Sequence, residues 1–252
     1  VDVELTISGL SAAYGKHRVL ESVDVEKLHG GQLVGLLGPN ASGKTTLIKS
    51  LAGVHRGCDG EVDFRVDATA PRGKRRRQLI GYVPQDLLSS ATLTAFESVM
   101  VSARRRGVDG WDPLERTADV MHRLGITHLS DRLVSDMSGG QRQLVAVAQM
   151  LVREPSVMLL DEPTSALDLR HQVELLRLIC DEVRGTDRVA LVAIHDLNLA
   201  ARYCDELLVL KAGRLVGQDT PHAVLTPDLL EDVYGFRARV LDDAGVPVVC
   251  PV

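Results

Sequence analysis

The sequence contains Gly38-Pro39-Asn40-Ala41-Ser42-Gly43-Lys44-Thr45, which fits the pattern Gly-x-x-x-x-Gly-Lys-[Ser/Thr]. Residues 32–37 before it are mostly apolar and indicate a short buried strand, and residues 46–52 after it indicate a helix closed by Gly53. In this order of strand, glycine-rich loop and helix, the glycines let backbone N–H groups point inward, and the helix N-terminus adds partial positive charge. The segment therefore predicts a phosphate-binding loop for a nucleotide.

Two side chains of this loop suit a nucleotide that carries Mg²⁺. Lys44 would reach the β- and γ-phosphates, and the Thr45 hydroxyl would ligate the metal ion. The alternative is a glycine-rich turn before an ordinary helix, which the flanking strand and helix disfavour. We therefore expect nucleotide contacts from Gly38, Pro39, Asn40, Ala41, Ser42, Gly43, Lys44, Thr45 and Thr46.

Composition and charge narrow the class of protein. The chain has 252 residues, of which 45% are apolar and 25% charged, as in a soluble globular protein with one large domain or two intimate ones. A net charge of −5 argues against a general attraction to nucleic acid, and we interpret the basic runs Lys74–Arg77 and Arg104–Arg106 as solvated faces. Four widely spaced cysteines show no metal-ligand pattern and suggest reduced thiols. No apolar run approaches the length of a membrane span, and no signal peptide is visible.

The rest of the chain alternates between strand and helix patterns. Strands are expected at 3–7 and 19–28, with a turn at 11–16 between them, and at 61–66, which we pair with 78–83 across a Pro- and Arg-rich connection. Further patterns predict a parallel sheet wrapped by helices. One helix is expected from Pro113 to Leu124, with Asp112 as its N-cap and with Leu114 and Met121 on its apolar face. The other expected helices are at 141–152, 169–183 and 197–203. The expected strands are at 157–160 and 189–194, followed by a hairpin of 206–210 with 215–217.

These elements predict one α/β domain over residues 1–252. Its core is that of a P-loop nucleoside triphosphatase (NTPase) with a mainly parallel sheet, built from residues 1–86 and 153–252, and its N-terminal part is an antiparallel β subdomain. Residues from about 87 to 152 form an inserted α-helical subdomain.

Two acidic residues end the strand at 157–160. Because ligands of open α/β sheets lie at the carboxyl ends of the strands, Asp161 would hold Mg²⁺ and Glu162 would polarise the attacking water. By themselves the two acids fit a strand that ends at a charged turn, and the phosphate-binding loop upstream makes that the minority interpretation.

Four further sites each carry a functional and a structural interpretation. Ser138-Gly139-Gly140-Gln141 opens a helix, either as an anion cradle for a nucleotide bound by another copy of the chain or as a simple N-cap with a flexible turn. His195 could donate to a γ-phosphate oxygen or be an ordinary strand-end histidine. Tyr14 could stack on an adenine or lie on a surface turn, and Gln85 could contact Mg²⁺ or water or be a polar loop residue.

Together these motifs resemble the nucleotide-binding subunit of ATP-binding cassette (ABC) transporters over nearly the whole chain. In that family the adenine-stacking aromatic matches Tyr14, the Walker A loop matches Gly38–Thr45, and the Q-loop matches Gln85. Further along the chain the signature matches Met137–Gln141, the Walker B strand Val157–Asp161, the catalytic base Glu162, the D-loop Ser165–Asp168 and the switch histidine His195. Met137 replaces the usual leucine and Ala41 stands where glycine is common, and neither change is expected to prevent binding.

The resemblance implies an active ATPase that uses ATP and Mg²⁺. It assigns catalysis to Glu162, His195 and Gln85, and metal binding to Thr45, Gln85 and Asp161. It also adds a second group of nucleotide-binding residues, Ser138, Gly139, Gly140, Gln141 and Asp168, which would act on the ATP of a second copy in a head-to-tail dimer.

The resemblance further implies an importer subunit at the cytoplasmic face of the cell membrane, bound to two separate permease subunits and served indirectly by an extracytoplasmic solute-binding protein. Residues 125–132, 195–203 and the tail from 233 to 249 are similar to the importer ATPases for ferric siderophores, a group that includes haem and cobalamin importers. A metal ion is a further candidate solute. The alternative from another class is a soluble ABC ATPase that acts on nucleic acid or ribosomes, which the negative charge and the single cassette disfavour.

Overall fold

A six-stranded sheet forms the centre of the computed structural model, which describes residues 2–87, 92–104 and 112–252. The strand order is β5-β6-β7-β3-β8-β9, and all neighbours are parallel except the hairpin of β8 and β9. The fold class predicted from the sequence is confirmed. The strands are β3 (Leu33–Leu37), β5 (Ile80–Val83), β6 (Val157–Leu160), β7 (Val189–Ala193), β8 (Glu206–Lys211) and β9 (Arg214–Asp219).

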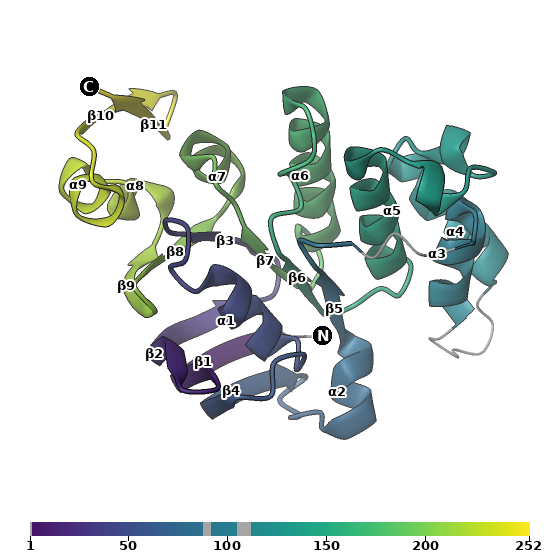
Figure 1. Cartoon of the computed structure of the whole chain (residues 1–252), viewed down its shortest axis with the longest axis horizontal. Helices are drawn as coiled ribbons and strands as arrows, with labels where there is room; N and C mark the ends of the chain where they lie inside the picture. Colours follow the sequence, from purple (N-terminus) through teal and green to yellow (C-terminus); the bar gives the residue numbers. More distant parts are fainter. Residues whose placement is uncertain (1, 88–91, 105–111) are drawn as a thin grey trace.

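A second, antiparallel sheet lies below the first in Figure 1 and has the order β2-β1-β4. Its strands are β1 (Val3–Tyr14), β2 (His17–His29) and β4 (Cys58–Val66). Helix α1 (Lys44–Leu51) lies between the two sheets, where its buried residues Leu47 and Ile48 join one apolar cluster with side chains of both sheets. This packing fixes the helix that carries the end of the phosphate-binding loop.

The helical part lies at one end of the sheet, beyond β5 (Figure 1). It contains α3 (Ala95–Arg104), α4 (Pro113–Arg123) and α5 (Gly139–Leu151), with single turns at Thr127–Leu129 and Val134–Asp136. Asp112 caps α4 by accepting from Leu114 N at 2.8 Å, and Pro113 follows it, as predicted. A large apolar cluster joins these helices to α6 (Leu169–Val183) on the upper face of the central sheet.

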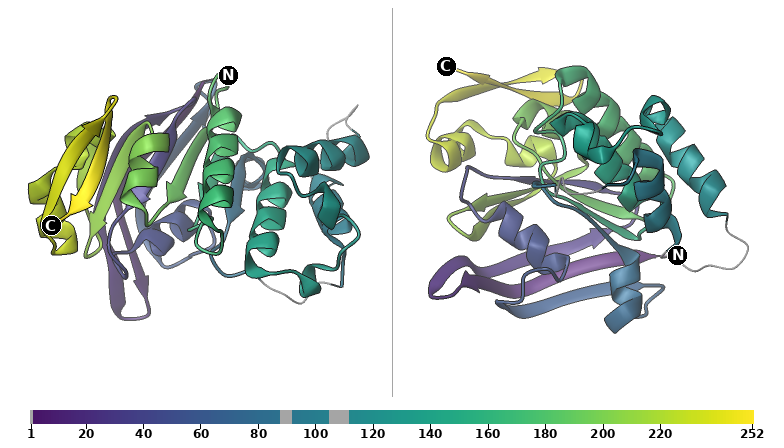
Figure 2. Two further views of the ribbon diagram at one scale, coloured as in Figure 1. Left: turned by 90° about the horizontal axis from the view of Figure 1, so that it is seen from above. Right: turned by 45° about the vertical axis from the view of Figure 1, so that its right-hand side comes forward.

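The last third of the chain follows β7. Helix α7 (Leu197–Tyr203) leads to β8 and β9, and α8 (Pro221–Val224) and α9 (Pro227–Tyr234) come next. The chain ends in a two-stranded antiparallel hairpin of β10 (Ala238–Asp243) and β11 (Val246–Pro251), which lies beside α7 in both Figures 1 and 2. Among the described residues, we find no helix with the length and apolar character that crossing a membrane requires.

The predicted pairing of 61–66 with 78–83 is wrong. Strand β4 pairs with β1, residues Gly73–Leu79 form helix α2, and β5 is the edge strand next to β6. Residues Gly73–Leu79 are mostly polar, and the exposed helix α2 keeps them in solvent. The residues of β5 instead join the parallel sheet.

Other boundaries and faces also differ from the expectations. Strand β1 runs through the predicted turn to Tyr14, because register shifts along its pairing with β2 let a long strand bend. Leu114 is 55% exposed, whereas Val120 and Met121 are buried, so the apolar face of α4 is rotated from the predicted one. Arg104 ends α3, and residues 88–91 and 105–111, including the rest of the second basic run, lie outside the described residues.

Candidate active site

The phosphate-binding loop connects β3 to α1 at the carboxyl end of the parallel strands. Gly38 and Gly43 have φ values of 144° and 107°, in the region that favours glycine. A Cβ at Gly38 would lie 2.3 Å from the carbonyl oxygen of Leu210, and one at Gly43 would lie 2.6 Å from Leu20 Cδ2. Both glycines are therefore required by conformation and by space, which explains their place in the motif.

Lys44 lies inside this loop. Its Nζ donates to the carbonyl oxygens of Gly38 at 2.7 Å and Pro39 at 3.2 Å, and the residue is only 5% exposed. Burial lowers the pKa of Lys44, and the charges of Glu162 and Asp161 oppose this shift. The loop thus holds a cation whose present partners are neutral carbonyl groups, and phosphate oxygens would be stronger partners.

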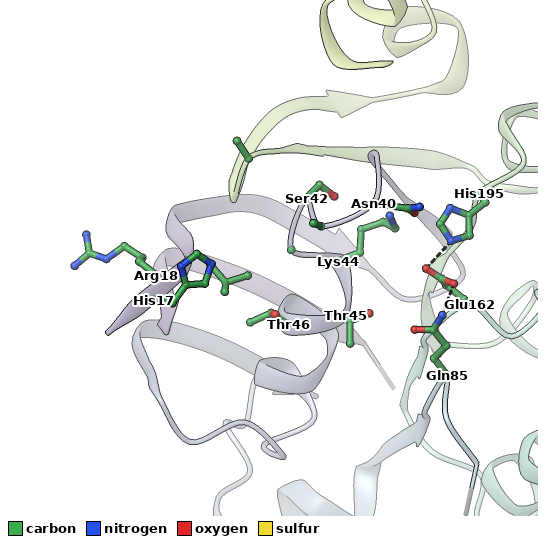
Figure 3. Close-up of a pocket in the computed structure, with 14 residues that line it drawn as sticks. His17, Arg18, Asn40, Ser42, Lys44, Thr45, Thr46, Gln85, Glu162 and His195 are labelled. Atoms are coloured by element: carbon green, nitrogen blue, oxygen red, sulfur yellow. Dashed lines mark hydrogen bonds and ion pairs between the residues drawn. The ribbon is translucent and has the colours of Figure 1, made fainter. Parts of the chain in front are cut away.

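A cavity of about 700 Å³ opens beside the loop and Lys44 (Figure 3). It brings together the predicted residues Asn40–Thr46, Gln85, Glu162 and His195. The sequence reasoning missed His17, Arg18, Val19 and Ala212, which also line it. The sequence signal that could have indicated His17, Arg18 and Val19 is their position at the start of β2, shortly after Tyr14, the predicted adenine-stacking residue. Nothing in the residue types indicated Ala212.

Two side chains near Lys44 fit a divalent cation. Thr45 Oγ1 donates to Asp161 Oδ1 at 3.0 Å, and the side chain of Asp161 is fully buried. Within the described part of the chain, Asp161 Oδ2 has no hydrogen-bond partner. Burial raises the pKa of Asp161, the bond from Thr45 lowers it, and the charge of Glu162 raises it. A buried carboxylate oxygen without a partner, next to a hydroxyl group, matches the oxygen ligands that Mg²⁺ prefers.

The structure joins the three predicted catalytic side chains through Glu162. Glu162 Oε1 lies 2.6 Å from His195 Nε2, and Glu162 Oε2 accepts from Gln85 Nε2 at 2.8 Å (Figure 3). Glu162 has a φ of 51°, which is uncommon for a residue with a side chain and is found at functional sites. Asp161 and Glu162, although adjacent, thus serve two different groups: Asp161 faces Thr45, and Glu162 is held between His195 and Gln85.

The predicted second cradle lies elsewhere. Ser138 Oγ accepts from Gln141 N at 3.3 Å and Gln141 Oε1 accepts from Ser138 N at 3.1 Å, which is a capping box at the start of α5. Ser138, Gly140 and Gln141 line a separate cavity of about 800 Å³ together with Asp168. No residue of the phosphate-binding loop lines that cavity. One copy of the chain therefore does not bring the two groups of predicted nucleotide contacts together.

Three predicted residues have local roles that the sequence did not indicate. Asp168 caps α6 by accepting from His171 N at 2.9 Å, and the hydrogen bonds from His171 lower the pKa of this exposed carboxylate. Tyr14 is 49% exposed, packs against His55 with ring centroids 4.4 Å apart, and does not line the cavity beside the loop. Ala41 has a φ of 62°, a left-handed conformation that glycine adopts more easily. The nucleotide contacts of these residues, like those of the other site residues, stay predictions.

Comparisons with known proteins agree with this geometry. The family model described as "ABC transporter" matches residues 22–165. The chain is 36% identical to the ferric enterobactin transport ATP-binding protein FepC of Escherichia coli (strain K12), over 96% of this chain and 92% of that protein. It is 34% identical to the hemin import ATP-binding protein HmuV of Photobacterium damsela subsp. piscicida, over 95% of this chain and 92% of that protein.

Two further comparisons extend the set. The chain is 35% identical to the cobalamin import ATP-binding protein BtuD of Halobacterium salinarum (strain ATCC 29341 / DSM 671 / R1), over 98% of this chain but only 63% of that longer protein. Among solved structures, cbiO1 of Clostridium perfringens, part of the ABC transporter complex cbiONQ, superimposes with a TM-score of 0.73. That match has 27% sequence identity and covers 90% of this chain and 92% of the other.

Proposed function

Because the chain belongs to the ABC transporter family, we propose that it is the ATP-hydrolysing subunit of an importer that takes up ferric siderophore chelates through separate permease subunits. The observation that carries the catalytic part is the placement of Glu162 between His195 and Gln85, in the same cavity as Lys44. This arrangement supplies a cation for the phosphates and a held carboxylate for the attacking water.

The reaction follows from the positions of these side chains. The triphosphate lies along the loop, and Lys44 exchanges the carbonyl oxygens of Gly38 and Pro39 for β- and γ-phosphate oxygens. Thr45 and Asp161, with Gln85 as a predicted third contact, would hold Mg²⁺, which would supply positive charge to offset the phosphate charge. Glu162 orients a water and accepts its proton as the water oxygen bonds to the γ-phosphorus and the bond to the β-phosphate oxygen breaks. In the nucleotide-free chain His195 Nε2 contacts Glu162, and with ATP bound its N–H donates to a γ-phosphate oxygen instead.

A complete site requires a second copy of the chain. The cradle of Ser138, Gly140 and Gln141 lies in a cavity separate from Lys44, so it can contact only a nucleotide bound by a partner. Two copies therefore close head to tail over two ATP molecules. ATP binds the closed dimer better than the open one, and hydrolysis removes that preference.

The permease would contact the chain near Gln85. A groove of about 400 Å³ lies between the segment Tyr82–Leu87 and the helical part, with residues of α3 and α5 on its other side. Gln85 contacts the catalytic Glu162 at one end of this segment, so occupancy of the ATP site and the position of the groove are linked. We place the protein at the cytoplasmic face of the membrane through this contact, with an extracytoplasmic solute-binding protein acting on the permease.

The solute class rests on the comparisons with relatives of this chain. Ferric siderophore is supported by the likeness to FepC, which extends over 96% of this chain and 92% of that protein. Haem is the second candidate, because HmuV shares similar coverage. Cobalamin has weaker support, because the chain spans 63% of BtuD. No side chain in this mechanism contacts the transported solute, so chemistry alone does not separate these candidates.

Uptake of radiolabelled iron as a ferric siderophore tests the proposal. Cells that lack the gene would be complemented with the wild type, with Glu162→Gln, or with Glu61→Gln as a control on the exposed face of β4. We expect the wild type and Glu61→Gln to restore uptake and Glu162→Gln to fail. Normal iron uptake in the deletion strain would contradict the siderophore assignment, and the same cells would then be tested with haem and cobalamin.

A further inference from the structure

We propose that Asn198 is a positioning residue for His195, and that it acts by tying the first turn of α7 to the C-terminal hairpin of β10 and β11. This inference rests on the proposed function, because it concerns the catalytic role of His195. It assigns a part in ATP hydrolysis to the hairpin, which lies outside residues 22–165, the range that the family model matches.

The contact between Asn198 and the hairpin is reciprocal. Asn198 Oδ1 accepts from Val249 N at 2.7 Å, and Asn198 Nδ2 donates to Val249 O at 3.3 Å. One side-chain amide thus satisfies both backbone groups of a single strand residue, as a neighbouring strand would. Val249 pairs with Val240 of β10, and these two bonds occupy its other edge. An edge position of the hairpin is therefore fixed to α7 by a donor and an acceptor together.

His195 lies between two anchors in the chain. On one side, Ile194 N donates to Leu36 O at 3.2 Å, which joins the segment to β3. On the other side, Asp196 caps α7 by accepting from Asn198 N and Leu199 N, each at 2.9 Å. His195 reaches Glu162 at 2.6 Å from this position. A shift of the first turn of α7 would therefore move the imidazole relative to Glu162.

Helix α7 depends on its neighbours for its position. It has seven residues, too few for a helix that is stable by itself. It packs mainly against β11 (Figure 1), and its buried residues Leu199 and Ala200 share an apolar cluster with Val249. The other tie, between Arg202 and Asp243 at 2.6 Å, is an exposed ion pair that contributes little. Asn198 is therefore the main directional link between the hairpin and α7.

A second contact to the hairpin supplies a matched control. His222 Nε2 lies 2.9 Å from Gly245 O in the hairpin turn, and His222 belongs to α8, not to α7. Substitution of His222 loosens the hairpin without acting directly on the segment that carries His195. A general effect of hairpin loosening would appear in both variants, whereas positioning of His195 would appear only in the Asn198 variant.

The experiment compares the wild type, Asn198→Ala and His222→Ala as full-length chains. We expect Asn198→Ala to lower kcat for ATP by about three- to tenfold, the equivalent of one or two ordinary hydrogen bonds, with KM changed by less than about twofold. His222→Ala should keep both parameters within about twofold of the wild type. Amide hydrogen exchange of residues 194–197 should be faster in Asn198→Ala only.

Two results would overturn the inference: unchanged exchange of residues 194–197 in Asn198→Ala, or an equal loss of kcat in His222→Ala. A wild-type chain that does not hydrolyse ATP would contradict the proposed function instead. Because the exchange measurement needs no turnover, it decides the positioning role in that case as well.

Discussion

Thr45 and Asp161 are 116 residues apart in the sequence, and a hydrogen bond of 3.0 Å joins the Thr45 hydroxyl to Asp161 Oδ1. The contact connects the start of α1, which follows β3, to the end of β6, and β7 lies between these two strands in the sheet. It uses one carboxylate oxygen of Asp161 and leaves the other, which is buried, without a partner in the described chain. The carboxylate is therefore arranged for a ligand rather than for the stability of the nucleotide-free chain.

We expect Asp161→Asn to stabilise the nucleotide-free chain and to inactivate it. Burial raises the folded-state pKa of Asp161, so the charged form destabilises the fold. This penalty begins as the pH rises above the unfolded pKa and is complete above the folded pKa, so it is present at neutral pH. Removal of the charge should raise Tm at pH 7 by a few degrees, with about 2–4 °C expected for each kcal/mol in a chain of this size.

The same variant should lower ATP turnover about a hundredfold or more, because the asparagine amide replaces a charged metal ligand. Thermal unfolding at pH 7 and pH 4 and an assay of phosphate release check both effects. The gain in Tm should shrink at the lower pH, where the wild-type carboxylate is closer to protonation. Asp131→Asn, on an exposed turn, is the control and should change neither Tm nor turnover. A lower Tm for Asp161→Asn would contradict the assignment of a destabilising charge.

Glu162→Gln should separate ATP binding from hydrolysis. Glutamine keeps the size of the side chain and an oxygen that accepts a hydrogen bond, but it does not accept the proton of the attacking water. We expect kcat to fall by about 10²–10⁴-fold, the range for loss of a general base, while the affinity for ATP is retained. Phosphate release and equilibrium binding of ATP measure the two quantities, with Glu61→Gln as the control. Substantial residual hydrolysis would remove Glu162 from the role of base.

Most residues that line the cavity beside Lys44 could be named from the sequence, because each motif has fixed local spacing. The glycines at 38 and 43 meet a local conformational requirement, and the acids at 161 and 162 follow an apolar strand that any sheet of this class would bury. The bounds of α6 and α7 also matched the sequence patterns, because helical periodicity is a local property of the sequence. The confirmed fold class follows from the same alternation of strands and helices.

Long-range partners could not be predicted in the same way. The segment 78–83 reads as a strand in isolation, and only the packing of the whole sheet decides that β5 pairs with β6 rather than with β4. Nothing in the local residue pattern indicated that Tyr14 packs against His55 or that Asn198 binds Val249. These contacts depend on chain segments that approach each other only after folding.

Ser138→Arg should prevent ATP-dependent dimerisation without preventing ATP binding. Ser138 lies in a cavity separate from Lys44, so the bulky cation would obstruct only a nucleotide brought by a partner chain. With ATP present, light scattering should show a dimer for Glu162→Gln alone and a monomer when Ser138→Arg is added to it. Ser8→Arg, on an exposed position of β1, is the control in the same background and should still dimerise. ATP-dependent dimerisation of the Ser138 variant equal to that of the control would refute the head-to-tail arrangement.

Ala41→Gly should stabilise the chain slightly, although glycine usually destabilises. Ala41 has a φ of 62°, where an L-residue carries about 1–2 kcal/mol of steric strain, and the added freedom of glycine in the unfolded chain offsets about 0.4–1 kcal/mol of the gain. The expected change in the free energy of unfolding is thus a gain of about 0–1.6 kcal/mol. Ala118→Gly, in the exposed interior of α4, should instead cost about 1 kcal/mol. Urea unfolding of both variants measures the difference, and a loss of stability in Ala41→Gly as large as that in Ala118→Gly would show that the loop carries no strain at this residue.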